Sequence, residues 1–176
     1  QQKGVAMKTA LKGRVWKFGD NIDTDIIIPA IYLASTDPKV LGDHCMEPIA
    51  PTFSKDVKPG DIIVAGLNFG CGSSREQAVS CLKGHDLIIV ARSVARIFLQ
   101  NAINLGLSVI ICPEWEGDEG DTLHISDDYV TNATRNTRSP IQPLPKARKA
   151  ILEAGGLIPY TRKRLIDSTV GKRSGL

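Results

Sequence analysis

Three short runs of apolar residues in the middle of the chain have the length and spacing of buried strands. They cover residues 61–66, 86–91 and 107–112, and none of them alternates between polar and apolar side chains. Strands that are apolar on both faces are typical of parallel sheets covered on both sides. The segments between them, 73–83 and 93–105, have a helical spacing of apolar residues. This alternation predicts an α/β fold with a parallel strand–helix–strand core. The apolar stripe of the second helix is expected to consist of Val94, Ile97, Phe98, Ala102 and Leu105.

The N-terminal part outside this core is less regular. Alternation over 13–18 predicts a short strand. Pro29 interrupts the apolar run 26–33, which is therefore not a central strand along its length. Three further prolines make 35–58 a loop-rich excursion, with a short helix expected over 38–46.

Toward the C-terminus the pattern predicts one more strand and one more helix. Residues 122–125 are expected to form an edge strand, and 132–145 to be a connector rich in Pro, Thr and Arg. A helix is expected over 146–154, closed by Gly155-Gly156.

Composition limits the class of protein. With 176 residues, of which 42% are hydrophobic and 23% charged, the chain has the make-up of a globular protein rather than of a disordered or fibrous one. This length corresponds to one domain, which we expect over 7–176. Residues 1–6, which precede Met7, are treated as a leader outside the fold. No apolar run approaches the roughly 18 residues of a membrane span.

Charge is distributed unevenly along the chain. The segment 146–176 carries eight basic residues against two acidic ones, whereas the whole chain has a net charge of +3. We expect this segment to be a basic helical extension of the domain. A basic tail could contact nucleic acid or an acidic partner. Tyr160 is the one aromatic residue in the segment, so a regulator that binds RNA by stacking bases is the less favoured interpretation.

The cysteines exclude two kinds of site. Cys45, Cys71, Cys81 and Cys112 contain no CxxC pair, and their spacing is that of neither an iron–sulfur cluster nor a zinc site. In a chain of this size they are expected to be reduced thiols, which indicates a cytoplasmic protein. No metal ligand is assigned in this chain.

The most informative stretch is Asn-Phe-Gly-Cys-Gly-Ser-Ser-Arg-Glu at 68–76, which follows a predicted strand and opens a predicted helix. Ser73 is expected at the N-cap, with Glu76 three residues later completing a capping box. The amides of the first turn and the guanidinium of Arg75 would then form a site for a carboxylate or phosphate.

Other interpretations of this stretch are weaker. Gly70, Gly72 and Arg75 give an incomplete dinucleotide-binding fingerprint, because arginine replaces the third glycine. Arg92 after the next strand could hold the 2′-phosphate of NADP, so an NADP-binding module is retained as an alternative. A P-loop is excluded, since no GxxxxGK[ST] is present. The remaining alternative is a capped helix without a ligand.

A second polar cluster lies at 19–25, Gly-Asp-Asn-Ile-Asp-Thr-Asp. A calcium loop beginning at Asn21 is rejected, because Ile26 and Tyr32 would stand where glycine and glutamate are required. Three aspartates leading directly into an apolar segment are costly for a simple turn, because part of the cluster must border buried surface. The cluster is therefore a second candidate for chemistry.

Taken together, these motifs resemble the small subunit of isopropylmalate dehydratase and homoaconitase, the detached swivelling domain of the aconitase superfamily. The resemblance covers about 13–160 and rests on Gly19–Asp25 followed by Ile27-Ile28-Pro29, Tyr32-Leu33, Asn68–Glu76, Ala95–Phe98 and Asn101–Asn104. It implies a swivelling β/β/α domain. It also implies a hydro-lyase that moves a hydroxyl group of a 2- or 3-hydroxy di- or tricarboxylate between adjacent carbons through an alkene.

The same resemblance implies a division of labour between two chains. The [4Fe-4S] cluster, a Lewis acid toward the departing hydroxyl, would be held by a separate large subunit in a heterodimer or heterotetramer, and this chain would bind no cofactor alone. Ser73 matches the family's general base and Asp25 an active-site acid. Substrate contacts are expected from Thr24, Leu33, Ala34, Ser35, Ser74 and Arg75, with Asp23, Gly72, Glu76 and Arg96 supporting them. Gln100 departs from the family's usual arginine, which leaves that position without a role.

The resemblance further implies that the loop 31–36 determines which substrate is accepted. The homoaconitase type resembles Tyr-Leu-Arg-Thr, whose arginine can pair with the distal carboxylate of a tricarboxylate. Ala34 and Ser35 supply no cation here, and a buried unpaired carboxylate is expensive. We therefore expect a branched dicarboxylate, 3-isopropylmalate first and hence leucine biosynthesis, with dimethylmalate, citramalate or homoaconitate as alternatives.

Overall fold

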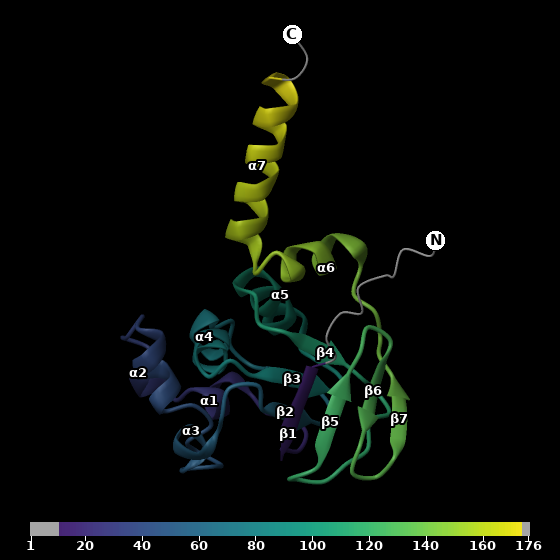
Figure 1. Ribbon diagram of the computed structural model, residues 1–176. Coiled ribbons are helices and arrows are strands. Elements are labelled where there is room, and N and C mark those ends of the chain that lie inside the picture. Colours follow the sequence, from purple (N-terminus) through teal and green to yellow (C-terminus); the bar gives the residue numbers. More distant parts are fainter. Residues whose placement is uncertain (1–10, 174–176) are drawn as a thin grey trace.

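Residues 11–173 are described by a computed structural model, in which one seven-stranded sheet organises the chain (Figure 1). The strand order is β4-β3-β2-β1-β5-β6-β7. The first four strands in this order are mutually parallel, and β5, β6 and β7 continue the sheet in antiparallel fashion from β1. The strands are β1 (Leu11–Lys17), β2 (Ile62–Ala65), β3 (Ile88–Ala91), β4 (Val109–Ile111), β5 (Thr122–Ile125), β6 (Tyr129–Asn132) and β7 (Thr137–Pro140). The predicted α/β fold with a parallel core is confirmed.

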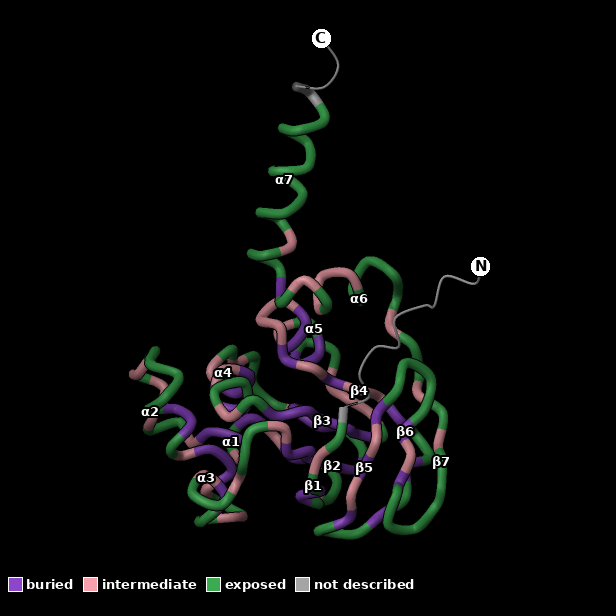
Figure 2. The backbone as a smooth tube through the Cα atoms, in the orientation of Figure 1, coloured by how far each residue is buried: buried purple, intermediate pink, exposed green. Residues whose placement is uncertain are grey.

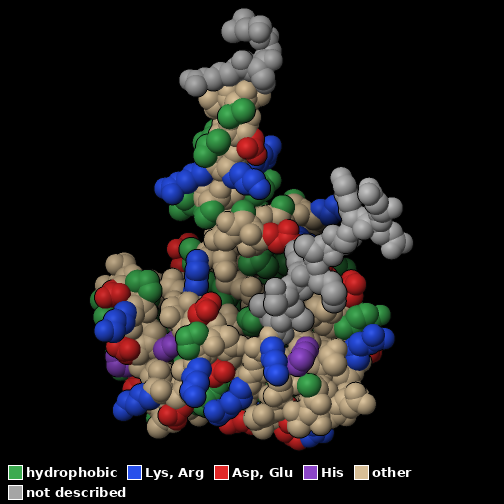
Figure 3. Space-filling view, viewed as in Figure 1, with side chains coloured by type: hydrophobic (Ala, Val, Ile, Leu, Met, Phe, Trp, Pro, Cys, Tyr) green, Lys and Arg blue, Asp and Glu red, His purple; other side chains and the backbone are tan. Residues whose placement is uncertain are grey.

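The helices lie mostly on one face of the parallel half of the sheet. They are α1 (Thr24–Ile27), the 3₁₀ helix η1 (Ala30–Tyr32), α2 (Pro38–Asp43), α3 (Phe53–Asp56), α4 (Glu76–Gly84), α5 (Arg96–Leu105), α6 (Lys146–Glu153) and α7 (Leu157–Arg173). Helix α7 projects from the body and is exposed along most of its length (Figure 2), and Figure 3 shows Lys and Arg side chains on its surface. No helix within 11–173 is both long and apolar enough to cross a membrane.

Both faces of the central strands are buried, as their continuous apolar sequence predicts. Ile63 and Ile89 pack with the helices, whereas Ile62 and Val90 face the opposite way. That second face is covered by Cys112, Trp115 and residues of β5 and β6, so the antiparallel half of the sheet curls over the parallel half.

Several boundaries differ from the expectations. Residues 122–125 are not an edge strand, because β5 pairs with both β1 and β6; β4 and β7 form the edges. The segment 132–145, expected to be a connector, contains strand β7. Its side chains are polar and mostly exposed, so the sequence has no apolar pattern that would indicate a strand. In α5, Ile97 is 44% exposed, whereas Leu99 and Ile103 are buried together with Phe98 and Ala102. The buried face of this helix therefore differs from the predicted stripe by about one residue position.

Candidate active site

The two polar motifs, fifty residues apart, meet at the carboxyl ends of β1 and β2. The Thr24 amide donates to the Cys71 carbonyl at 2.9 Å, and the Gly70 amide donates to the Ile22 carbonyl at 2.8 Å. The hydroxyl of Thr24 donates to the Ser73 carbonyl at 3.1 Å. Thr24 is buried, which satisfies the expectation that part of the aspartate cluster borders the core. Backbone and side-chain bonds thus hold the two loops together as one unit.

Two glycines give the 70–72 turn its shape. Gly70 has φ +77°, and a Cβ there would lie 2.2 Å from Cγ of Phe98, which no side chain can accept. Gly72 has φ +93°, and a Cβ there would lie 3.5 Å from the hydroxyl oxygen of Thr24. Left-handed backbone strongly favours glycine. Gly70 therefore allows the loop to pack against α5, and Gly72 turns the chain toward α1.

Helix α4 begins at Glu76, so the predicted Ser73 N-cap and its capping box are wrong. The N-cap is Arg75, whose side chain makes no capping hydrogen bond. The reason is a contact with a distant part of the chain: after Gly72 the chain runs past α1, where the Thr24 hydroxyl donates to the Ser73 carbonyl, before the helix starts. Ser73 and Ser74 are exposed, and neither hydroxyl has a hydrogen-bond partner among residues 11–173. Both hydroxyls are consequently available to a ligand.

Arg75 and Asp25 form an ion pair between the loop and α1. The pair joins Nη1 of Arg75 to a carboxylate oxygen of Asp25. The Arg75 side chain is 18% exposed and the Asp25 side chain 62%. One guanidinium nitrogen is thus engaged and the rest of the fork has no partner among the described residues, although a guanidinium carries five N–H donors. Arg75 is held in place with donors left for a carboxylate.

The neighbouring Asp23 has a structural task. It is the N-cap of α1, and its carboxylate accepts a 2.8 Å hydrogen bond from the Ile26 amide. This bond satisfies one of the free amides at the helix start. Asp23 therefore orients the turn that presents Thr24 and Asp25.

A cavity of about 90 Å³ lies between the loop and α5, and neither Asp23 nor Asp25 lines it. It is lined by Thr24, Gly70, Gly72, Ser73, Ser74, Arg75, Ala95, Ile97, Phe98 and Asn101. Pockets for small ligands generally measure about 300–1,000 Å³. The cavity is smaller than this range, so a ligand larger than a small group such as a carboxylate would extend beyond it.

The remaining predicted site residues lie outside this cavity. Glu76 and Arg96 are the exposed first residues of α4 and α5. Leu33, Ala34 and Ser35 follow η1 and do not line the cavity. The sequence argument missed Asn101 as a lining residue; its signal was the Asn-Ala-Ile-Asn motif, which was noted without a role.

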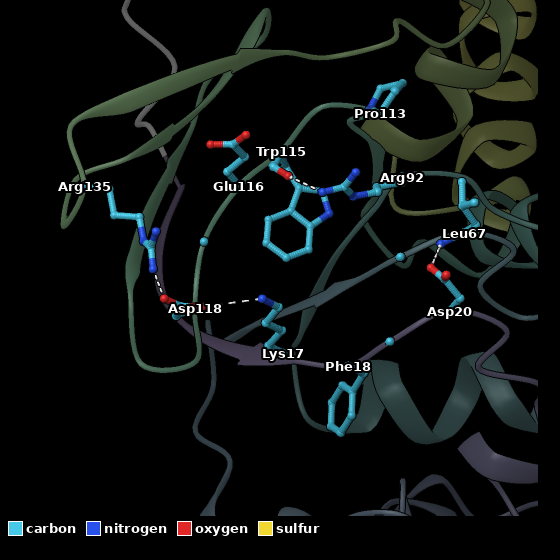
Figure 4. A pocket seen from close by; sticks show the side chains of 13 residues that line it. Lys17, Phe18, Asp20, Leu67, Arg92, Pro113, Trp115, Glu116, Asp118 and Arg135 are labelled. Atoms are coloured by element: carbon cyan, nitrogen blue, oxygen red, sulfur yellow. Dashed lines mark hydrogen bonds and ion pairs between the residues drawn. The ribbon is translucent and has the colours of Figure 1, made fainter.

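A larger hollow of about 560 Å³ lies where β1 and β2 end, with Lys17, Asp20 and Leu67 among the residues that line it (Figure 4). Lys17 and Arg135 both reach Asp118, so their charges are compensated. Arg92 donates from Nη2 to the Trp115 carbonyl at 3.1 Å, and its guanidinium lies 5.7 Å from the centre of the Trp115 ring. Acids and bases thus balance in this hollow, which gives it no marked preference for an anionic ligand.

Titratable groups elsewhere give no metal site. Within residues 11–173 no three His, Cys, Asp or Glu side chains gather where they could hold a metal ion. Cys45, Cys71, Cys81 and Cys112 are all free thiols. The residues present therefore do not fit an iron–sulfur cluster.

Comparison with known proteins settles the family. Residues 20–114 match the model of the aconitase C-terminal domain. This chain belongs to the aconitase C-terminal domain family. The resemblance stated from the motifs is confirmed, in preference to the dinucleotide-binding alternative.

Similarity to members of this family extends over most of the chain. It is 48% identical to the 3-isopropylmalate dehydratase small subunit of Thermodesulfovibrio yellowstonii, over 88% of this chain and 95% of that protein. It is also 48% identical to the isopropylmalate/citramalate isomerase small subunit of Methanocaldococcus jannaschii, over 92% and 99%. A crystal structure of 3-isopropylmalate dehydratase from Methanocaldococcus jannaschii matches with a TM-score of 0.87 and 47% identity, covering 91% of this chain and 98% of that one.

Proposed function

We propose that this chain is the small subunit of a hydro-lyase that converts 3-isopropylmalate to 2-isopropylmalate through the alkene, a step of leucine biosynthesis. The observation that carries the proposal is that Ser73 and Arg75 line one small cavity while Asp25 pairs with Arg75. The names of the full-length relatives supply the reaction type and the substrate class.

In this proposal Arg75 binds a substrate carboxylate. Its guanidinium pairs with Asp25, its side chain is largely buried, and Arg75 lines the cavity. A planar fork with two parallel donors matches a carboxylate better than a point charge does. Ser74 and Thr24 border the same space and can complete the carboxylate contacts.

Ser73 is proposed to remove the proton from the carbon next to that carboxylate. A serine hydroxyl is a weak base unless its alkoxide is stabilised. The Arg75 guanidinium two residues away can provide this stabilisation, more effectively in a site closed to water. Because Ser73 does not cap α4, the helix end contributes less to this stabilisation than the sequence argument assumed.

The other half of the site belongs to a partner in this proposal. The cavity is too small for a branched dicarboxylate, and the described part of the chain, 11–173, gathers no ligands for a cluster. We propose that a large subunit closes over this face, holds the [4Fe-4S] cluster and forms a heterodimer or heterotetramer with this chain. A cytoplasmic location is part of the proposal and is supported by four free thiols.

The test is activity of the assembled enzyme. The chain is combined with a large subunit of a 3-isopropylmalate dehydratase and assayed on isopropylmalate, dimethylmalate, citramalate and homoaconitate. We expect kcat/KM to be highest for isopropylmalate. A clear preference for homoaconitate would contradict the proposed substrate class. A small alkylmalate as the best substrate would replace isopropylmalate but leave the reaction type intact.

A further inference from the structure

The loop expected to read the substrate is attached to the body through an aromatic stack. Tyr32, at the end of η1, lies directly on the imidazole of His44, with ring centroids 3.6 Å apart and planes at 5°. Tyr32 is half-buried, whereas Ala34 and Thr36 after it are exposed. The other ties of this loop are local: the Ser35 amide donates to the Tyr32 carbonyl, and the Asp37 amide donates to the Ser35 hydroxyl.

A carboxylate lies beside both rings. Oε2 of Glu47 lies 2.9 Å from Nδ1 of His44. Desolvation and, after it, the charge of this carboxylate raise the pKa of the Tyr32 phenol, so Glu47 is close to the tyrosine as well. Tyr32, His44 and Glu47, which we call the loop brace, fix the plane of the tyrosine ring.

The base of the brace is anchored in the core. Met46, between His44 and Glu47, is completely buried with φ +60°, and its amide donates to the Ile27 carbonyl at 2.9 Å. A left-handed methionine is unusual and persists only where its surroundings fix it. His85, the C-cap of α4, contacts the Gly42 carbonyl at 2.6 Å. The segment that carries His44 is thus tied to both α1 and α4, the two helices of the candidate site.

Packing alone does not account for this cluster. The side chains of His44 and Glu47 are 34% and 41% exposed, and pairs this accessible add little to global stability. Their effect is local, because they determine where Tyr32 lies and hence where the loop leaves η1. Accordingly, their removal should alter the loop far more than it alters the fold.

We infer that His44 and Glu47 are positioning residues that hold Tyr32 and thereby set the substrate preference of the loop at 33–36. This inference rests on the proposed function, since it concerns how the same enzyme distinguishes alkylmalates. Neither residue contacts the cavity beside Ser73, so the chemical step does not depend on them.

Two measurements test the brace, and one of them requires no activity. Hydrogen exchange of amides 31–37 in the free subunit is compared among wild type, His44→Ala and His44→Phe. We expect His44→Ala to speed exchange about 10-fold or more, because it removes the stack, while His44→Phe retains it. The control is His124→Ala on β5, which should leave the loop unchanged. Equal exchange in wild type and His44→Ala would overturn the inference.

In the assembled enzyme, the ratio of kcat/KM for isopropylmalate to that for citramalate is measured for the same variants and for Glu47→Gln. We expect His44→Ala to change this ratio by about 5-fold or more through KM, within the range that pocket contacts provide, with rescue by His44→Phe. An unchanged ratio, or an equal loss of kcat on both substrates, would overturn the inference. If wild type accepts neither substrate, the proposed function fails while hydrogen exchange still decides the brace.

Discussion

Arg75 holds the carboxylate of Asp25, fifty residues earlier in the chain, and this ion pair joins the two motifs of the candidate site. The pair has an electrostatic consequence. Asp25 offsets part of the guanidinium charge before substrate arrives, so Arg75 can be largely buried without an unpaired charge. The N–H donors of Arg75 that do not pair with Asp25 can then orient a substrate carboxylate as well as attract it.

Replacing Arg75 with lysine should weaken substrate binding. An ammonium keeps the charge but cannot pair with Asp25 and a substrate carboxylate through one planar fork. We expect kcat/KM of the assembled enzyme to fall about 10- to 100-fold, corresponding to roughly 1.4–2.8 kcal/mol. The change should appear mainly in KM. Arg138→Lys, on the exposed strand β7, is the matched control and should keep wild-type kinetics.

Replacing Ser73 with alanine should separate catalysis from stability. Loss of a general base commonly costs about 10²- to 10⁴-fold in turnover. Because Ser73 is not the N-cap of α4, the penalty of about 1 kcal/mol for losing a cap should be absent. Thermal unfolding and steady-state kinetics measure the two effects. A variant with near-normal kcat would require another base.

The two glycines of the loop should respond differently to alanine. Gly70→Ala places a Cβ 2.2 Å from Phe98, so it should destabilise the fold by about 3 kcal/mol or more, or prevent folding. Gly120 also has positive φ, +86°, but open space around it, so Gly120→Ala should cost only about 1 kcal/mol. Urea unfolding gives the free energy of unfolding of both variants, and the difference between them measures the cost of the clash with Phe98. Similar costs for the two would show that α5 does not pack against the loop as described.

Alkaline pH should destabilise the protein through Cys112. Burial raises the pKa of this thiol from 9.0 to about 11. Below pH 9 both folded and unfolded thiols are neutral, so there is no effect. Between pH 9 and 11 only the unfolded thiol ionises, and the free energy of unfolding falls, by about 1.4 kcal/mol at pH 10. Cys112→Ala should show a smaller decrease between pH 8 and pH 10 in urea unfolding. An identical decrease in wild type and Cys112→Ala would contradict this assignment.

The parts of the fold that follow from local pattern were predictable, and those that depend on distant partners were not. The strands β2 and β3 are apolar on both faces, which identifies them without a structure. The polar strand β7 is recognisable only by its ladder to β6. Similarly, the start of α4 depends on Thr24 binding the Ser73 carbonyl, a contact across 49 positions that no capping pattern contains.

For the candidate site, residue types were predictable from the motifs but their grouping was not. The Gly-Asp-Asn-Ile-Asp-Thr-Asp and Gly-Cys-Gly-Ser-Ser-Arg-Glu motifs contain the side chains that meet at the cavity. The roles assigned to Ser73, Asp25 and Arg75 stay predictions. Asn101 and the Tyr32–His44 stack escaped notice because each depends on packing between elements that are separate in sequence.

The most direct test of the central claim is a titration of the large subunit with this chain. Alkene formation from isopropylmalate is followed by ultraviolet absorbance for each chain alone, for the pair, and for the pair containing Ser73→Ala. The account predicts activity from the wild-type pair only, saturating at a fixed ratio of the chains, and a turnover reduced by about 10²-fold or more with Ser73→Ala, which should still bind the large subunit. Alkene formation by the large subunit alone, or full activity of the Ser73→Ala pair, would contradict it.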